Sequence, residues 1–294
     1  MPASFDDIDR GLDDTMEWLE SLGVRIQSTR IEAYRKSYDS LLDIYRTRDE
    51  AAAATKLKEL VFALLEVHDL LEIHRGLSGG THDEYLRGRL AKLSSGPVDY
   101  VDENASSGNL PRNTAFELLL TARLAAAGFP LLKHSTVDIA TNVGRKRVLI
   151  ECKRPQSFDG IERRIKSGFS QLKKQYKRPF ARNVRGIVAV DISKIVNPNM
   201  NIWRYDNPSD IGQQLGNTIE KYATTLSRTI SGSGQRKTIA VIFRIGIMAA
   251  PRSDKDNIVY CQQYGFNTLR SSGKSDKETA ITIGRAIERV YSDY

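Results

Sequence analysis

The feature that most constrains the fold is a pair of short alternating segments, 135–141 (STVDIAT) and 145–153 (RKRVLIECK). Alternation of apolar and polar residues is typical of β-strands whose two faces differ. The linking residues end in Gly144, and glycine at the first central position suits a type II′ hairpin turn. The sequence therefore predicts a β-hairpin with a two-residue loop, Gly144 and Arg145.

This loop decides which residues face each other across the hairpin. Paired residues are equidistant from the loop, which places Asp138 opposite Glu151 on one face. Lys153 lies two residues after Glu151 and shares that face. The opposite, core-facing side carries the apolar set Val137, Ile139, Val148, Ile150 and Cys152.

Two carboxylates that face each other repel, and this repulsion is a cost for a purely structural strand. A divalent cation would remove the cost, because Mg²⁺ binds one or two carboxylates together with water and phosphate oxygens. The ammonium of Lys153 could then hold a metal-bound water or neutralise charge on a phosphate. A surface ion pair between Glu151 and Lys153 is the simpler alternative, and the hairpin alone leaves it open.

Helical patterns on both sides of the hairpin add candidate site residues. A helix predicted over 111–127 places Glu117 at the edge of its buried stripe, from which a carboxylate can reach a neighbouring site. A second helix, predicted over 160–178, stacks four residues along one edge at helical spacing. These four residues are Arg164, Gly168, Gln171 and Gln175.

An aspartate, a hairpin turn and a Glu-x-Lys motif, with a helical glutamate upstream and a helix downstream, resemble the PD-(D/E)XK nuclease superfamily. The resemblance covers residues 111–192, and its motif stands here as Asp138, Glu151 and Lys153. It implies the restriction-endonuclease-like fold and an enzyme that cuts phosphodiester bonds, mostly in DNA, with Mg²⁺ or Mn²⁺.

The resemblance also implies roles for single residues. The implied metal ligands are Asp138, Glu151, the backbone carbonyl of Cys152, and Glu117. Lys153 would position or activate the attacking water. Gln171 is a further catalytic candidate, although Gln175 stands where some RecB-type members have tyrosine and Tyr176 comes one residue later.

Outside the hairpin, the periodicities predict a helical N-terminal region, 1–100, and an α/β (α+β) domain, 101–294. One long helical pattern covers 37–74, and a Ser, Gly and Pro-rich stretch precedes residue 111. From there the order is helix, strands, helix, strand, helix, strands, helix. This order predicts a restriction-endonuclease-like core with a mixed central sheet flanked by helices.

Positive charge is concentrated around the motif. The net charge is +8, and residues 144–185 hold fourteen Lys and Arg against three acids. A basic surface of this kind suits the phosphates of a nucleic acid, although a solvated basic face is the plain alternative. The expected nucleic-acid contacts are Arg145, Lys146, Arg154, Arg164 and Lys174.

Composition excludes several other classes. No apolar run approaches the roughly 20 residues of a membrane span, and the acidic N-terminus is unlike a signal peptide. Two cysteines cannot form a disulfide framework or a four-cysteine zinc site. We therefore expect a cytoplasmic protein without a membrane partner.

Two functions remain open. The first is a metal-dependent endodeoxyribonuclease that acts in restriction or anti-phage defence. The second is a non-catalytic nucleic-acid-binding or regulatory module that keeps the nuclease fold. In either case the N-terminal helices could form a homodimer, contact a protein partner or recognise the substrate.

Overall fold

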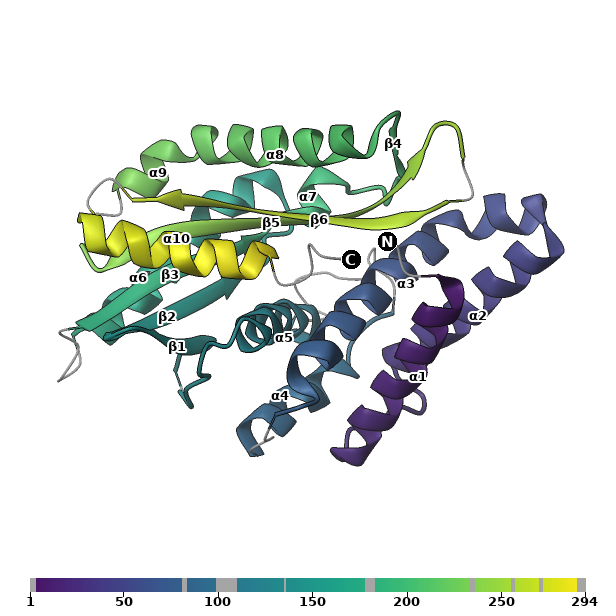
Figure 1. Cartoon of the computed structure of the whole chain (residues 1–294), viewed down its shortest axis with the longest axis horizontal. Helices are drawn as coiled ribbons and strands as arrows, with labels where there is room; N and C mark the ends of the chain where they lie inside the picture. Colours follow the sequence, from purple (N-terminus) through teal and green to yellow (C-terminus); the bar gives the residue numbers. More distant parts are fainter. Residues whose placement is uncertain are drawn as a thin grey trace.

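A computed structural model describes residues 4–80, 84–98, 110–134, 136–177, 183–232, 236–254, 257–269 and 272–289. Within these ranges a six-stranded sheet carries helices on both faces and a helical N-terminal region at one end (Figure 1). The helices are α1 (Phe5–Ser21), α2 (Arg30–Thr47), α3 (Glu50–Leu77), α4 (Glu84–Leu93), α5 (Leu110–Ala126), α6 (Phe158–Tyr176), α7 (Ser193–Val196), α8 (Pro208–Thr225), α9 (Ser227–Gly232) and α10 (Lys274–Arg289). The strands are β1 (Ile139–Val143), β2 (Lys146–Lys153), β3 (Val184–Asp191), β4 (Trp203–Tyr205), β5 (Thr238–Pro251) and β6 (Val259–Thr268).

The sheet is mixed, as the order of elements predicted. Its strands follow the order β1-β2-β3-β5-β4, and β6 pairs with β5. The strands β2, β3, β5 and β4 run parallel, whereas β1 and β6 are antiparallel to their neighbours. The α/β class with a mixed sheet and a helical N-terminal region is therefore confirmed.

Both faces of the sheet are buried. On one face, Leu149 of β2 packs in a cluster with Ile165 of α6 and Leu215 of α8. On the other face, Ile150 of β2 packs with Leu120 of α5 and with residues of α10. Strands covered on both sides are typical of parallel sheets. The side of β2 that carries Glu151 and Lys153 is thus also covered, by α6.

The N-terminal helices pack directly against the rest of the protein (Figure 1). Their apolar cluster includes Leu118 and Leu119 of α5 and Met248 of β5. One face of α5 therefore packs against the N-terminal helices, and the other packs against the sheet. The expected boundary near residue 100 lies outside the described residues.

Several elements differ from the sequence-based expectation: β1 begins at Ile139 rather than at 135, and the short helix α7 was not predicted. The single helix predicted over 37–74 is divided, because Arg48 has φ +55 and ends α2 in the left-handed conformation. Asp49 then caps α3 by accepting a hydrogen bond from the amide of Ala52. Strand β4 was not predicted, since three residues are too few to show a period. In the described part of the chain, every helix is too short or too polar to cross a bilayer.

Candidate active site

The β1–β2 hairpin has the predicted register. Ile139 pairs with Ile150, and Val143 pairs with Lys146, so the loop is Gly144 and Arg145. Gly144 has φ +57 and Arg145 is not among the residues with positive φ, which is the φ pattern of a type II′ turn. The turn and the alternation thus specified the pairing correctly.

Asp138 lies one residue before β1 begins, in the position that the register places opposite Glu151. Its Oδ2 accepts a hydrogen bond of 2.7 Å from the backbone amide of Cys152. Cys152 itself is a buried core residue, and burial raises the pKa of its thiol well above the ordinary value. The carboxylate of Asp138 is therefore fixed to the backbone of β2, directly beside the Glu-x-Lys motif.

Glu151, Lys153 and Asp138 form one cluster near the carboxyl end of β2. The Nζ of Lys153 donates to Oε2 of Glu151 at 2.9 Å and lies 3.7 Å from Oδ2 of Asp138. The side chains of Glu151 and Lys153 are 2% and 11% exposed. This burial excludes the simple surface ion pair.

The electrostatics of Glu151 are unusual for a carboxylate. Burial and the negative charge of Asp138 raise the pKa of Glu151, Lys153 lowers it, and together these effects leave the pKa at about 7. Its Oε1 is buried and has no hydrogen-bond partner. A buried acceptor without a partner is costly, and a cation at this oxygen would remove the cost.

The two carboxylates fit a magnesium site in which the protein supplies few of the ligands. Mg²⁺ commonly takes one or two protein carboxylates and fills its other positions with water and substrate oxygens. Asp138 and Glu151 supply such a pair, with the free Oε1 of Glu151 as the open acceptor. The carbonyl of Cys152 as a further ligand stays a prediction.

Glu117 is close to this cluster but is held by another residue. Its carboxylate forms an ion pair with Arg89 of α4, and the same guanidinium donates to the backbone carbonyl of Asp138 at 2.5 Å. Across the described ranges, no three His, Cys, Asp or Glu residues are grouped so that they could hold a metal. The structure therefore brings two of the three predicted acids together, and Arg89 is a neighbour that sequence reasoning missed.

Helix α6 packs over the cluster at Gly168. A Cβ at Gly168 would lie 3.0 Å from both methyls of Val188 and 3.4 Å from Cε of Lys153. Glycine thus allows the helix to approach the stem of Lys153. Gln171, one turn later, is exposed.

Gln175 anchors the segment that leads into Asp138. It is 7% exposed, its Nε2 donates to the carbonyl of Thr136, and its Oε1 accepts from the Thr136 hydroxyl. This side chain therefore ties α6 to the backbone two residues before Asp138. The sequence placed Gln175 on the correct helix edge but did not predict this contact.

The predicted nucleic-acid contacts divide into two groups. Arg145, Arg164 and Lys174 are exposed, as expected. Lys146 instead binds Asp276 and neighbouring oxygens at the start of α10, and Arg154 is buried beside Asp191. Lys146 and Arg154 are therefore not part of the exposed basic surface, because acidic partners inside the protein engage them.

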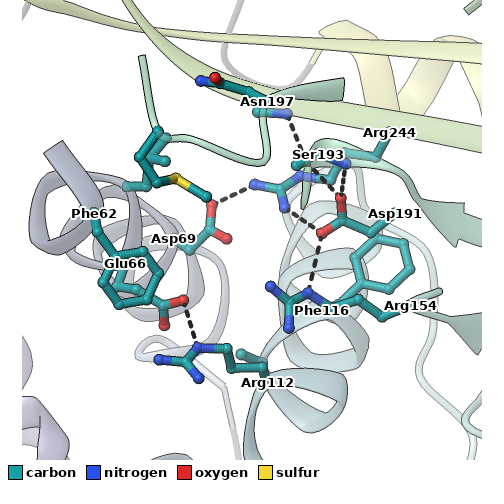
Figure 2. Close-up of a pocket in the computed structure, with 14 residues that line it drawn as sticks. Phe62, Glu66, Asp69, Arg112, Phe116, Arg154, Asp191, Ser193, Asn197 and Arg244 are labelled. Carbon is teal, nitrogen blue, oxygen red and sulfur yellow. Dashed lines mark hydrogen bonds and ion pairs between the residues drawn. The ribbon is translucent and has the colours of Figure 1, made fainter. Parts of the chain in front are cut away.

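A second polar cluster lies on the opposite face of the sheet, between α3, α5 and the carboxyl ends of β2 and β3 (Figure 2). It surrounds a cavity of about 40 Å³, room for a few water molecules. Its charged lining residues are Glu66, Asp69, Arg112, Arg154, Asp191 and Arg244. The sequence signal for it was Arg244, a single charge inside an otherwise apolar strand.

Arg244 is the centre of this second cluster. It donates to Asp191 at 2.9 Å, to the hydroxyl of Tyr260 at 2.7 Å, and also to Asp69. Burial alone would raise the pKa of Asp191, but Arg244 and Arg154 outweigh it and hold that pKa below its usual range. The lining contains three arginines and three carboxylates, so its formal charges balance. This arrangement joins the helical region to the sheet.

A scan against models of known protein families finds no match for this chain, and a search of curated proteins finds no similar sequence. Its function must therefore follow from its own residues. The cluster around Arg244 balances three arginines against three carboxylates, although Nε of Arg244 is also buried without a hydrogen-bond partner. The cluster of Asp138, Glu151 and Lys153 instead combines close carboxylates, an ammonium and an acceptor without a partner.

Proposed function

We propose that the protein is a divalent-metal-dependent nuclease of PD-(D/E)XK type with a restriction-endonuclease-like core, which hydrolyses phosphodiester bonds in DNA. One observation carries the proposal: Glu151 is buried beside Asp138 and Lys153, and its Oε1 has no partner. Such an arrangement costs folding free energy in the absence of a cation. A site for a cation explains why a folded protein would keep it.

Each residue of the cluster has a distinct task in this reaction. Asp138 and Glu151 would hold Mg²⁺ or Mn²⁺, which supplies charge neutralisation at the phosphate and lowers the pKa of bound water. Lys153 is placed to orient the attacking water or to stabilise charge on the phosphate. The Cys152 amide holds Asp138, and the packing of α6 at Gly168 holds Lys153.

The substrate surface would include the exposed basic residues of α6. Arg164 and Gln171 lie about one turn on either side of Gly168, which contacts the stem of Lys153. Arg145 lies six residues from Glu151 along β2, roughly 20 Å away, at the far end of the strand. Arg164 is therefore the best placed of the predicted phosphate contacts, while Arg145 could meet only a distant part of a duplex.

The decisive experiment measures cleavage of plasmid, linear duplex, single-stranded DNA and RNA with Mg²⁺, Mn²⁺ or EDTA. Asp138→Asn, Glu151→Gln and Lys153→Met should each reduce DNA cleavage by about 100-fold or more, because each removes charge placed at the reacting phosphate. Lys36→Met is the matched control, since Lys36 is an exposed lysine of α2 that pairs with Glu32 on the surface and lies outside the basic residues of α6. Cleavage by Glu151→Gln at the wild-type rate would refute the proposal.

A non-catalytic nucleic-acid-binding module is the second candidate, and the Arg89–Glu117 ion pair favours it. That pair neutralises one of the acids that the resemblance assigns to the metal. A module of this kind would bind DNA with an affinity that falls steeply with salt, yet would cleave no substrate with any metal. Fluorescence anisotropy over a salt series, alongside the cleavage assay, distinguishes the two candidates.

A further inference from the structure

Arg89 brings the N-terminal helical region into the candidate active site. It lies on α4, and its guanidinium pairs with Glu117 of α5 and donates to the carbonyl of Asp138 at 2.5 Å. Both side chains of the pair are 13% exposed. A residue from a region with no assigned role thus contacts two of the predicted site residues.

The position of Arg89 is itself fixed. Its Nη1 also donates to the hydroxyl of Tyr85 at 2.8 Å, and its guanidinium lies over the Tyr85 ring at 5.5 Å from the centroid. The planar guanidinium can bind several acceptors at once in one geometry, which a lysine ammonium does less well. Arg89 therefore joins α4, α5 and the start of β1 through one side chain.

We propose that Arg89 is a positioning residue of the candidate nuclease site, which keeps Glu117 out of the metal's ligand set and fixes the backbone at Asp138. In consequence the cation is held by Asp138 and Glu151, without the third acid. This inference rests on the proposed function, and it departs from the ligand set that the family resemblance implies.

The energetics favour a lasting Arg89–Glu117 pair. Arginine stays protonated at all ordinary pH values, so the ion pair is not broken by deprotonation of Arg89. If Glu117 turned away to bind a metal, Arg89 would be left largely buried without its counter-charge, which is strongly unfavourable. A cation bound by Glu117 would also lie close to the positive guanidinium and be repelled by it.

The test measures Mn²⁺ affinity by calorimetry in the absence of nucleic acid. Glu117→Gln should change the affinity less than two-fold, because Glu117 is not a ligand. Asp138→Asn and Glu151→Gln should each weaken it at least ten-fold. Arg89→Met should bind Mn²⁺ several-fold more tightly than the double variant Arg89→Met, Glu117→Gln, because only the single variant frees a carboxylate for the metal.

Arg87→Met is the matched control, because Arg87 is an exposed arginine on the same helix, and it should leave the affinity unchanged. Loss of Mn²⁺ binding in Glu117→Gln equal to that in Asp138→Asn would overturn the inference. So would an Arg89→Met variant that binds Mn²⁺ no more tightly than the double variant Arg89→Met, Glu117→Gln. Arg89→Gln, which removes the charge and keeps a hydrogen-bond donor, tests the same point if Arg89→Met does not fold.

A second measurement separates this inference from the proposed function. The Cys152 amide donates to Asp138, so its hydrogen exchange reports the position of Asp138 without any metal. Exchange at Cys152 should accelerate in Arg89→Met and stay unchanged in Arg87→Met. If the wild type bound no Mn²⁺, the proposed function would fail, whereas unchanged exchange in Arg89→Met would overturn the positioning role by itself.

Discussion

At the scale of single residues, the site depends on a glycine as much as on its charged groups. Gly168 allows α6 to lie against Val188 and the stem of Lys153. The ammonium of Lys153 reaches both Asp138 and Glu151 from there. The orientation of Lys153 is therefore set by helix packing as well as by charge.

Gly168→Val should reduce DNA cleavage more than it reduces the stability of the protein. Its added carbons would meet Val188 at 3.0 Å or less and press on Lys153, so we expect about 1–3 kcal/mol of destabilisation and a larger loss of cleavage. Urea unfolding and the DNA cleavage rate measure the two effects. The control is Gly212→Val on α8, where no atom lies within 4 Å of an added Cβ. This variant should leave the stability and the cleavage rate nearly unchanged. Equal effects of the two variants would contradict the prediction.

His68 is a residue whose charge state should affect stability. Its ring stacks on Tyr260 at 4.7 Å, and burial, aided by Arg75, lowers the pKa of His68 to about 4. The folded state thus disfavours the protonated ring relative to the unfolded state, whose pKa is about 6.5. The stability contribution is complete above pH 6.5 and is lost as the pH falls from 6.5 to 4.

His68→Phe keeps the ring contact but cannot titrate. The wild type should lose about 1–3 kcal/mol more stability than His68→Phe between pH 6.5 and pH 4, measured by urea unfolding at each pH. His134→Gln serves as the control, because His134 lies in the loop before β1 and not in α3. If the unfolding free energies of the wild type and His68→Phe fell equally with pH, the pKa of His68 would be the same in the folded and unfolded states.

At the scale of elements, α3 of the helical region crosses α5 closely at Gly76. A Cβ at Gly76 of α3 would lie 2.4 Å from the carbonyl oxygen of Ala122 in α5. Because that atom belongs to the backbone, it cannot turn aside as a side chain would. The α3–α5 crossing therefore requires glycine at this position.

Gly76→Ala should destabilise the protein by about 2–3 kcal/mol, because α3 must move away from α5. Gly88→Ala is a matched helical substitution on α4, where the added methyl meets open space. It should stabilise the protein by about 0.5–1 kcal/mol, since alanine restricts the unfolded chain. Thermal unfolding of the two variants gives the comparison, and a neutral Gly76→Ala would mean that the helices adjust freely.

The sequence was sufficient where the determinants are local. The hairpin register followed from one glycine and an alternating pattern, so the proximity of Asp138, Glu151 and Lys153 could be predicted. The mixed sheet followed from the order of helices and strands. The break at Arg48 could not be predicted, because no glycine or proline marks it.

The sequence was insufficient where partners are distant along the chain. Lys146 and Arg154 resembled phosphate contacts because their acidic partners, Asp276 and Asp191, are brought near only by folding. Arg89 was missed for the same reason, since it lies about 50 residues before Asp138 in a helix without a motif. A basic residue can be assigned to a surface only after its internal partners are known.

At the scale of the whole molecule, a buried ionic cluster joins the helical region to the sheet. Arg244 of β5 bonds with Asp69 of α3 and with Asp191, the last residue of β3 (Figure 2). A second link pairs Arg123 of α5 with Glu72 of α3 through two hydrogen bonds of 2.8 and 2.9 Å. Breaking one partner of such a cluster leaves the others buried and uncompensated.

These links predict that the two parts unfold as one cooperative unit. The two tryptophans report on them separately, because Trp18 lies in α1 and Trp203 in β4. Single-tryptophan variants, Trp18→Phe and Trp203→Phe, should show urea unfolding midpoints that coincide with each other and with the loss of circular dichroism. Arg244→Met should lower the unfolding free energy by about 3–5 kcal/mol, since Asp69 and Asp191 lose their shared counter-charge. Both urea midpoints should therefore fall together. Different midpoints in the two single-tryptophan variants with Arg244 intact would instead show that the helical region and the sheet are independently stable. The ionic cluster would then be a contact between two units rather than part of a common core.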